Sequence, residues 1–359
     1  PPRSTLFPYT TLFRSPMGLG RQADRQDAMW ISRDSIPKSR GHVFYDRLQG
    51  ILLKHGFDRF SEDLCAPFFD DSRGRRSIPP GRYFRMLLIG YFEGLDSERG
   101  IEWRCADSLS LREFLLLQTS ESVPDHSTLS RTRSRLSLEA HSQVFTFVLG
   151  LLTAEGLIKG KRLGVDGSTM EANAALRTIV RRDSGEGYND MLRRMAKESG
   201  IETPTQDDLI RLDRQRKGKK LSNKDWTSPT DPEARIAKMK DGRTRLAYKP
   251  EHAVDLDSGA IVAAKVHPAD QGDTATLPKT LDKALEQLEA VDKKPTKSER
   301  CEAVCDKGYF SRETLKQFDG GVWKTRIAEP KRKGLNWWGG DHEARRAVYN
   351  NRARIASEV

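Results

Sequence analysis

Two aspartates, far apart in the chain, each end a short apolar segment, and together they could bind metal ions. Asp166 ends the stretch LGVD, and Asp306 ends the stretch AVCD. If the two segments are parallel neighbouring strands, both carboxylates lie side by side at the carboxyl edge of a sheet. Hard divalent cations such as Mg²⁺ relieve the repulsion between two such carboxylates. Two cations about 3.5–4 Å apart would stabilise an in-line displacement at phosphorus.

The same residue types also have a purely structural interpretation. Aspartate is common at strand ends, where it forms turns or caps helices, and this applies to Asp166 and Asp306. Asp270 and Asp273, in PADQGD, could line the same edge or could belong to a turn and helix start. Without further Cys or His residues nearby, the CEAVC segment (301–305) is not expected to bind zinc.

The second half of the chain alternates strand and helix patterns, which predicts an α/β domain. The turn Asp257-Ser258-Gly259 separates two strand segments and is a strong hairpin signal. Helical spacing of leucines predicts a helix over 274–290. The other expected elements are strands at 162–166, 303–305 and from 322, and helices at 310–318 and from 341. This order is typical of a mixed sheet flanked by helices, a fold that can bring distant strand ends together.

Residues 181–245 interrupt this pattern, and their polar, Gly- and Pro-containing composition predicts an insertion or long loop, partly disordered. Residues 181–250 contain 18 basic and 12 acidic side chains, and 321–359 contain 9 and 4, which accounts for the whole net charge of +11. Such clustering indicates a phosphate-rich partner, although solvated loops would show it as well. The candidate phosphate contacts in the basic stretch RLDRQRKGKKLSNK are Arg216, Lys217, Lys219 and Lys220.

The part of the chain before this domain, residues 40–158, has helical periodicity. Within it, the sequence VPDHST is a helix-start signal, and the short helix that follows contains Arg131, Arg133 and Arg135. Arg131 and Arg135 are four residues apart and share one helix face. A basic helix in this setting is typical of a helix-turn-helix DNA reader, or of an exposed helix in a scaffold bundle.

Composition excludes several classes of protein. The chain has 359 residues, of which 36% are hydrophobic and 31% charged. Its longest apolar run, Val144–Leu152, is shorter than the ~20 residues of a membrane-spanning helix. No secretory signal opens the chain, and four cysteines do not make a disulfide scaffold. We therefore expect no membrane partner and a reducing, cytoplasmic location.

The two ends of the sequence lead to separate expectations. Residues 1–16 include TLFPYTTLFRS, which resembles the translation of a sequencing-adapter oligonucleotide, so we expect this segment to be non-native. At the other end, the helical pattern from Asp341 continues to the last residue without a stop signal. We expect the second domain, 161–359, to be incomplete at its C-terminus.

Several blocks of the sequence, taken in order, resemble DDE transposases of bacterial insertion sequences. The blocks are VDGSTMEANA, DPEARIAKMKDGRTRLAYKPEHAVDLDSGAIV, ADQGDTATL and AVCDKGYFS. The helical part, from YDRLQG through VPDHSTLSRTRSRL, is similar to the InsH-type N-terminal domain of those enzymes. The resemblance implies an RNase H-like mixed-sheet catalytic domain (α/β) preceded by an all-α DNA-binding domain.

The resemblance also implies a catalytic triad of acids, with Asp166 and Asp306 as the first two. In the family the third acid, a glutamate, follows a YxxR pattern, seen here at Tyr349–Arg352, by a few helical turns. Glu358 does not occupy the matching position. We therefore expect strand cleavage only from a form of this chain that extends further.

The expected function is transposition: Mg²⁺-dependent cleavage and strand transfer at insertion-sequence ends, with two Mg²⁺ ions, or Mn²⁺ in their place. The expected partners are double-stranded DNA of the element ends and the target, and a second copy of the chain in a dimer on DNA. Within the cytoplasm, association with the nucleoid is expected. A different class of function is a non-catalytic DNA-binding fragment that occupies element ends. An RNase H-type nuclease would share the metal chemistry but not the helical domain.

Overall fold

The computed structural model describes residues 42–70, 77–118, 120–216, 221–331 and 338–357. The adapter-like segment, Lys217, Lys219, Lys220 and Glu358 lie outside these ranges. The chain divides between Arg135 and Leu136 into two compact units.

The first unit is helical, as its periodicity predicts. Gly94, in the left-handed conformation, ends α3 (Pro80–Glu93), while Ser97 caps α4 (Glu98–Ala106) and Ser108 caps α5 (Leu109–Phe114). Leu52, Phe57 and other apolar side chains form its interior. The helices are α1 (Val43–Lys54), α2 (Phe57–Cys65), η2 (Ala66–Phe68), α3 (Pro80–Glu93), α4 (Glu98–Ala106), α5 (Leu109–Phe114) and α6 (His126–Arg135).

The second unit contains a seven-stranded mixed sheet with the central order β2-β6-β1-β8-β9, and β5 and β7 also pair with β6. β1 is antiparallel to β6 and parallel to β8, which is in turn parallel to β9. The strands are β1 (Arg162–Gly167), β2 (Met170–Glu171), β5 (Arg235–Lys238), β6 (Thr244–Asp255), β7 (Ile261–Pro268), β8 (Cys301–Cys305) and β9 (Trp323–Ile327). The predicted fold class, an RNase H-like mixed sheet after a helical domain, is confirmed.

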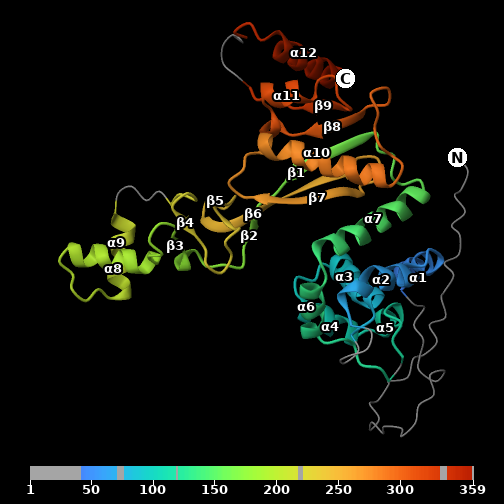
Figure 1. The fold of residues 1–359 in the computed structure, drawn as a ribbon, viewed down its shortest axis with the longest axis horizontal. Helices are drawn as coiled ribbons and strands as arrows, with labels where there is room; N and C mark the ends of the chain where they lie inside the picture. The colour runs from blue at the N-terminus through green and yellow to red at the C-terminus, as the bar shows by residue number, and fades with distance from the viewer. Residues whose placement is uncertain (1–41, 71–76, 119, 217–220, 332–337, 358–359) are drawn as a thin grey trace, which may run out of the picture. The chain divides into compact units, whose positions relative to one another are not determined.

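Helices pack on this sheet and close its core. α10 (Asp273–Ala290) lies along β6 and β7, and α11 (Arg312–Phe318) and α12 (His342–Ala356) pack at β9 (Figure 1). α7 (Leu138–Ala154) contacts α10. The core joins Leu163 and Val165 of β1 with Leu277 and Leu281 of α10. Because side chains alternate along a strand, the intervening residues of β1, Gly164 and Asp166, lie on the other face.

Of the two alternatives expected for residues 181–245, an insertion or a long loop, partly disordered, the loop is wrong for the residues described. The segment folds around its own small core, in which Met191, Leu192, Leu209 and Trp226 are buried. Apolar residues repeat with helical spacing between the charged ones, which is enough to build two amphipathic helices. The elements are η3 (Leu176–Thr178), β3 (Val180–Arg181), α8 (Tyr188–Glu198), α9 (Gln206–Gln215) and β4 (Trp226–Thr227).

Among the residues that the structure describes, none of the helices is long and apolar enough to cross a membrane.

The predicted hairpin forms between β6 and β7, with Asp255 at the turn. This buried carboxylate accepts hydrogen bonds from the backbone N–H groups of Lys159 and Gly160, each at 3.0 Å, and from that of Asp257. These bonds fix the backbone where the chain enters β1.

Candidate active site

Asp166 and Asp306 lie at the ends of two neighbouring parallel strands. The ladder between β1 and β8 pairs Val165 with Cys305, and the two aspartates follow one residue later on each strand. Neighbouring strands are about 4.8 Å apart, so the carboxylates project from adjacent positions of one sheet edge. The predicted parallel pairing of the two strands is confirmed. The catalytic role of the residues stays a prediction.

The two aspartates line a shallow hollow of about 670 Å³ on the uncovered face of β1. Its floor is mainly apolar, formed by residues such as Val254, Leu256 and Val304, and His252 lies opposite Asp166 on β6. Both aspartates are exposed. The hollow is therefore open enough to admit a large substrate to the carboxylates.

The hydrogen bonds of the two aspartates leave most of their acceptor capacity free. Asp166 Oδ1 accepts the N–H of Gly167 at 2.9 Å, and Asp306 Oδ1 accepts that of Gly308 at 2.8 Å, which caps the short helix η4 (Lys307–Tyr309). Neither carboxylate forms an ion pair with a described residue. Magnesium binds through one or two carboxylates and keeps several waters. The donor set therefore fits a hard divalent cation.

A buried polar network, which was not expected from the sequence, lies directly behind this edge. Its centre is Glu251 on β6, which is fully buried and accepts hydrogen bonds from Thr276 and Thr280 of α10, each at 2.5 Å. Tyr309 donates a third hydrogen bond to Glu251 at 3.0 Å, and the Lys249 ammonium lies 3.1 Å away. The network thus joins β6, α10 and η4.

Lys249 connects Glu251 to the rim of the site. Its Nζ lies 2.5 Å from Asp273 Oδ1 and 2.8 Å from Thr276 Oγ1. Burial alone would raise the pKa of Glu251, but the hydrogen bonds from Thr276 and Thr280, together with the Lys249 ammonium, outweigh it and hold this pKa below its ordinary value. Glu251 therefore stays ionised, and Lys249 balances its charge.

Two glycines bring this network close to the strand ends that carry Asp166 and Asp306. A side chain at Gly308 would collide with Asp273 Oδ2 and would lie 3.0 Å from Asp306 Oδ1. A side chain at Gly167, next to Asp166, would lie 3.2 Å from the Lys249 stem and from the Tyr309 hydroxyl. The network and the two aspartates therefore share one tightly packed region.

Asp270 and Asp273 have different partners in the structure. Asp273 is the first residue of α10, after the N-cap Gly272, and forms the ion pair with Lys249. Asp270 Oδ2 accepts a hydrogen bond from Asn223 at 3.3 Å. Of the two, Asp273 is the one in contact with the region of Asp306.

The three arginines of α6 have three different environments. Arg131 and Arg135 line a groove of about 790 Å³ together with Phe69, and Arg135 stacks on that ring at 5.3 Å. Arg131 is exposed and bonds back to Ser127 of its own helix. Arg133 forms an ion pair with Glu98 at 3.1 Å. Thus Arg131 and Arg135 share a face, and Arg133 is engaged elsewhere.

The turn before α6 is longer than in a compact helix-turn-helix. Residues 115–125 separate α5 from α6, whereas that motif has a turn of three or four residues.

At the start of α6, the carboxylate of Glu102 accepts hydrogen bonds from the N–H and Nδ1 of His126, with Asp125 at 3.3 Å from the ring. Capping of the helix accounts for this cluster.

Arg216 is the only one of the four basic candidates in the insertion that falls within the described residues. Its guanidinium bonds to Asp213 and to the Tyr188 hydroxyl, each at 2.8 Å. This side chain holds α9 against α8. To contact a phosphate as well, the Arg216 guanidinium would have to divide its donors between the phosphate and its bonds to Asp213 and Tyr188. Its role in DNA binding remains a prediction.

Comparison with known families agrees with the site and the fold. Residues 32–135 match the family described as Transposase domain (DUF772), and residues 179–355 match the Transposase DDE domain. Asp306 lies inside the second range and Asp166 precedes it. No curated protein shows significant similarity to the chain. The two family matches, in the expected order and covering most of the chain, show that it belongs to the DDE transposases of insertion sequences.

Proposed function

We propose that the chain acts in divalent-metal-dependent cleavage and strand transfer at the ends of an insertion sequence, with Asp166 and Asp306 as metal-binding catalytic residues. The observation that carries the proposal is the pairing of β1 with β8, which puts two exposed carboxylates without a described cationic partner at adjacent strand ends. A cation bound between carboxylates in this arrangement would relieve their mutual repulsion, and the hollow leaves room for a phosphodiester beside it.

Each residue near the edge has a definable task in this reaction. Asp166 and Asp306 would bind Mg²⁺ or Mn²⁺. The N–H groups of Gly167 and Gly308 hold these two carboxylates in place. The bound cation would supply charge neutralisation and activation of water. Lys249 and Glu251 do not reach the reacting atoms, and their task is to fix the backbone of the loop that carries Asp306.

The chemistry consists of two displacements at phosphorus. In the first, water forms a bond to phosphorus and the bond to the 3′ oxygen breaks, which leaves a 3′ hydroxyl and a 5′ phosphate. In the second, that 3′ oxygen attacks a phosphodiester of the target and displaces the target's own 3′ oxygen. The open hollow suits this sequence because two duplexes must reach the same carboxylates.

Double-stranded DNA would be recognised through the first unit. Arg131 and Arg135 supply two cations on one helix face beside a groove, and we assign them to contact with the element ends. Handling of two ends in one event favours two copies of the chain on the DNA.

Incubation of the chain, and of a C-terminally extended form of it, with a duplex that contains the element ends tests this proposal. In the extended form, strand breaks with 3′ hydroxyl ends are expected in Mg²⁺ or Mn²⁺, and they should disappear in Asp166→Asn and Asp306→Asn. Asp282→Asn, an exposed residue of α10, is the matched control and should cut normally. Binding of the ends by the extended form without cleavage in either metal would contradict the catalytic proposal and support the non-catalytic DNA-binding role.

A further inference from the structure

A basic cleft lies at the end of the sheet opposite to Asp166 and Asp306. Its volume is about 690 Å³, and it is formed where β1, β8 and β9 begin. Seven cationic and four acidic side chains line it. The cations are Lys159, Lys161, Arg162, Lys293, Lys294, Arg300 and Lys324.

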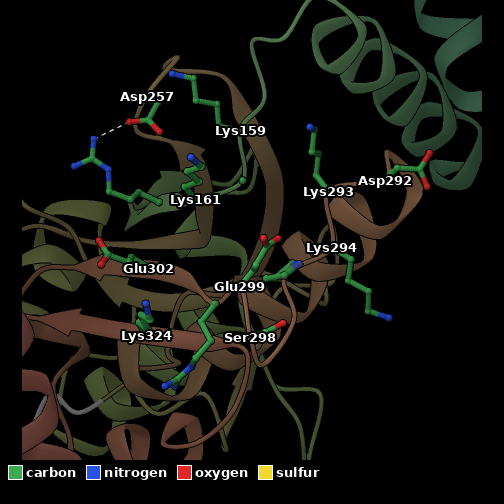
Figure 2. Close-up of a pocket in the computed structure, with 14 residues that line it drawn as sticks. Lys159, Lys161, Asp257, Asp292, Lys293, Lys294, Ser298, Glu299, Glu302 and Lys324 are labelled. Atoms are coloured by element: carbon green, nitrogen blue, oxygen red, sulfur yellow. Dashed lines mark hydrogen bonds and ion pairs between the residues drawn. The ribbon is translucent and has the colours of Figure 1, made fainter.

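Four of these lysines have no partner among the described residues. The ammonium groups of Lys159, Lys161, Lys293 and Lys324 form neither a hydrogen bond nor an ion pair there. Figure 2 shows Lys159 and Lys161 on the side of Asp257, Lys293 across the cleft beside Asp292, and Lys324 near Glu302. The free positive charges therefore come from separate segments that surround one space.

The acidic residues of the cleft do not neutralise these lysines. Asp257 is bound to Arg162 at 2.7 Å, and Glu302 is bound to Arg326 at 3.0 Å. Arg162 first, and then Lys159 and Lys161, hold the pKa of Asp257 below its ordinary value. Asp292 and Glu299 remain, so a net positive charge faces the cleft.

The lining also indicates which anion fits. Pro295 is the only apolar side chain among the lining residues, and no aromatic ring is present. Small organic ligands favour apolar pockets, and single-stranded DNA favours aromatic platforms for its bases. Lysines as point charges, in an open polar cleft, suit the phosphates of a duplex, which carry no sequence information.

We propose that this cleft binds the backbone of duplex DNA away from the scissile phosphate, an inference that rests on the proposed function. Arg162 and Asp166 are four residues apart on β1, which corresponds to about 13 Å. Since base pairs are spaced about 3.4 Å apart, the contacted phosphates lie at least about four base pairs from the reaction. The cleft thus extends the footprint of the catalytic unit without reading bases.

The experiment measures binding of the chain to a 40-base-pair duplex of random sequence at several salt concentrations. The test variant replaces Lys159, Lys161, Lys293 and Lys324 by glutamine. We expect it to bind at least about tenfold more weakly near 0.15 M salt, with a salt slope lower by about 2–4, since each lost phosphate contact reduces the slope by about 0.9. The charge-matched control replaces Lys238, Lys240, Lys265 and Lys279, which lie outside the cleft.

Every outcome of this experiment either supports or overturns DNA binding by the cleft. Weaker binding by the test variant alone supports the cleft, whereas equal losses in both variants, or no loss in the test variant, overturn it. Failure of the unmodified chain to bind duplex DNA would overturn the proposed function together with the cleft. If the test variant misfolds, acetylation of lysines in the unmodified chain replaces it: DNA should protect Lys159, Lys161, Lys293 and Lys324, and unchanged acetylation overturns the proposal.

Discussion

Replacement of Lys249 by methionine tests whether the buried network behind the active-site edge is held together by charge. Methionine keeps the length of the side chain and removes the ammonium that lies 3.1 Å from Glu251 and 2.5 Å from Asp273. Glu251 is fully buried, so water cannot replace the lost cation. The three hydroxyl donors of Glu251 remain, but none of them carries a positive charge.

The expected loss is about 3–5 kcal/mol, the typical effect of removing one partner of a buried ion pair. This corresponds to a fall of about 10²- to 10⁴-fold in the protection of β6 amides in native-state hydrogen exchange. The loss should be smaller at pH 5 than at pH 7.5, because a proton on Glu251 removes the unbalanced charge in the variant. Hydrogen exchange of β6 peptides by mass spectrometry measures both effects locally.

Two variants control this experiment. Lys293→Met removes an exposed lysine and should change stability by no more than about 0.5 kcal/mol. Glu251→Gln, added to Lys249→Met, should recover part of the loss, because the unpaired charge disappears. A loss below about 1 kcal/mol for Lys249→Met, or a further additive loss in the double variant, would refute the argument.

Three further predictions concern other residues. Gly308→Ala forces the loop away from Asp273 and should weaken Mn²⁺ binding by about 10–100-fold in a titration, while unchanged affinity would show that the loop is not held by the network. Burial lowers the pKa of His267 more than the nearby Glu251 raises it, so below about pH 6.5 the imidazole takes up a proton more readily in the unfolded chain than in the folded one. The free energy of unfolding should therefore decline as the pH falls below this value. His267→Gln should flatten this pH profile in denaturant titrations. Replacing Arg131 and Arg135 by glutamine should lower the salt slope of duplex binding by about 2, and an unchanged slope would exclude both as phosphate contacts.

Patterns of strands and helices were sufficient to predict most of the catalytic unit. The apolar runs before Asp166 and Asp306 are β1 and β8, and the leucines of 274–290 face the core as α10. Local periodicity determines such elements because each buries one face. The insertion is not predictable as helical at first sight, because its many charges conceal two short repeats, Met191, Leu192 and Ala196 in α8 and Leu209 and Leu212 in α9.

The buried network could not be read from composition, although a signal was present. Along β6, every second residue from Ala247 to Asp255 is buried, and this places Lys249 and Glu251 on the core face. Charged residues in such positions contradict the usual pattern, so they are easily taken for a solvent-exposed run. Only the tertiary structure supplies Thr276, Thr280 and Tyr309, which come from elements distant in sequence.

Titration of the protein with Mn²⁺, followed by electron paramagnetic resonance, tests most directly whether the ends of β1 and β8 form one metal site. We expect the unmodified chain to bind the ion and both Asp166→Asn and Asp306→Asn to weaken binding at least about tenfold, because each removes a ligand from the same site. Asp282→Asn should bind as the unmodified chain does. Unchanged affinity in either active-site variant would contradict the account.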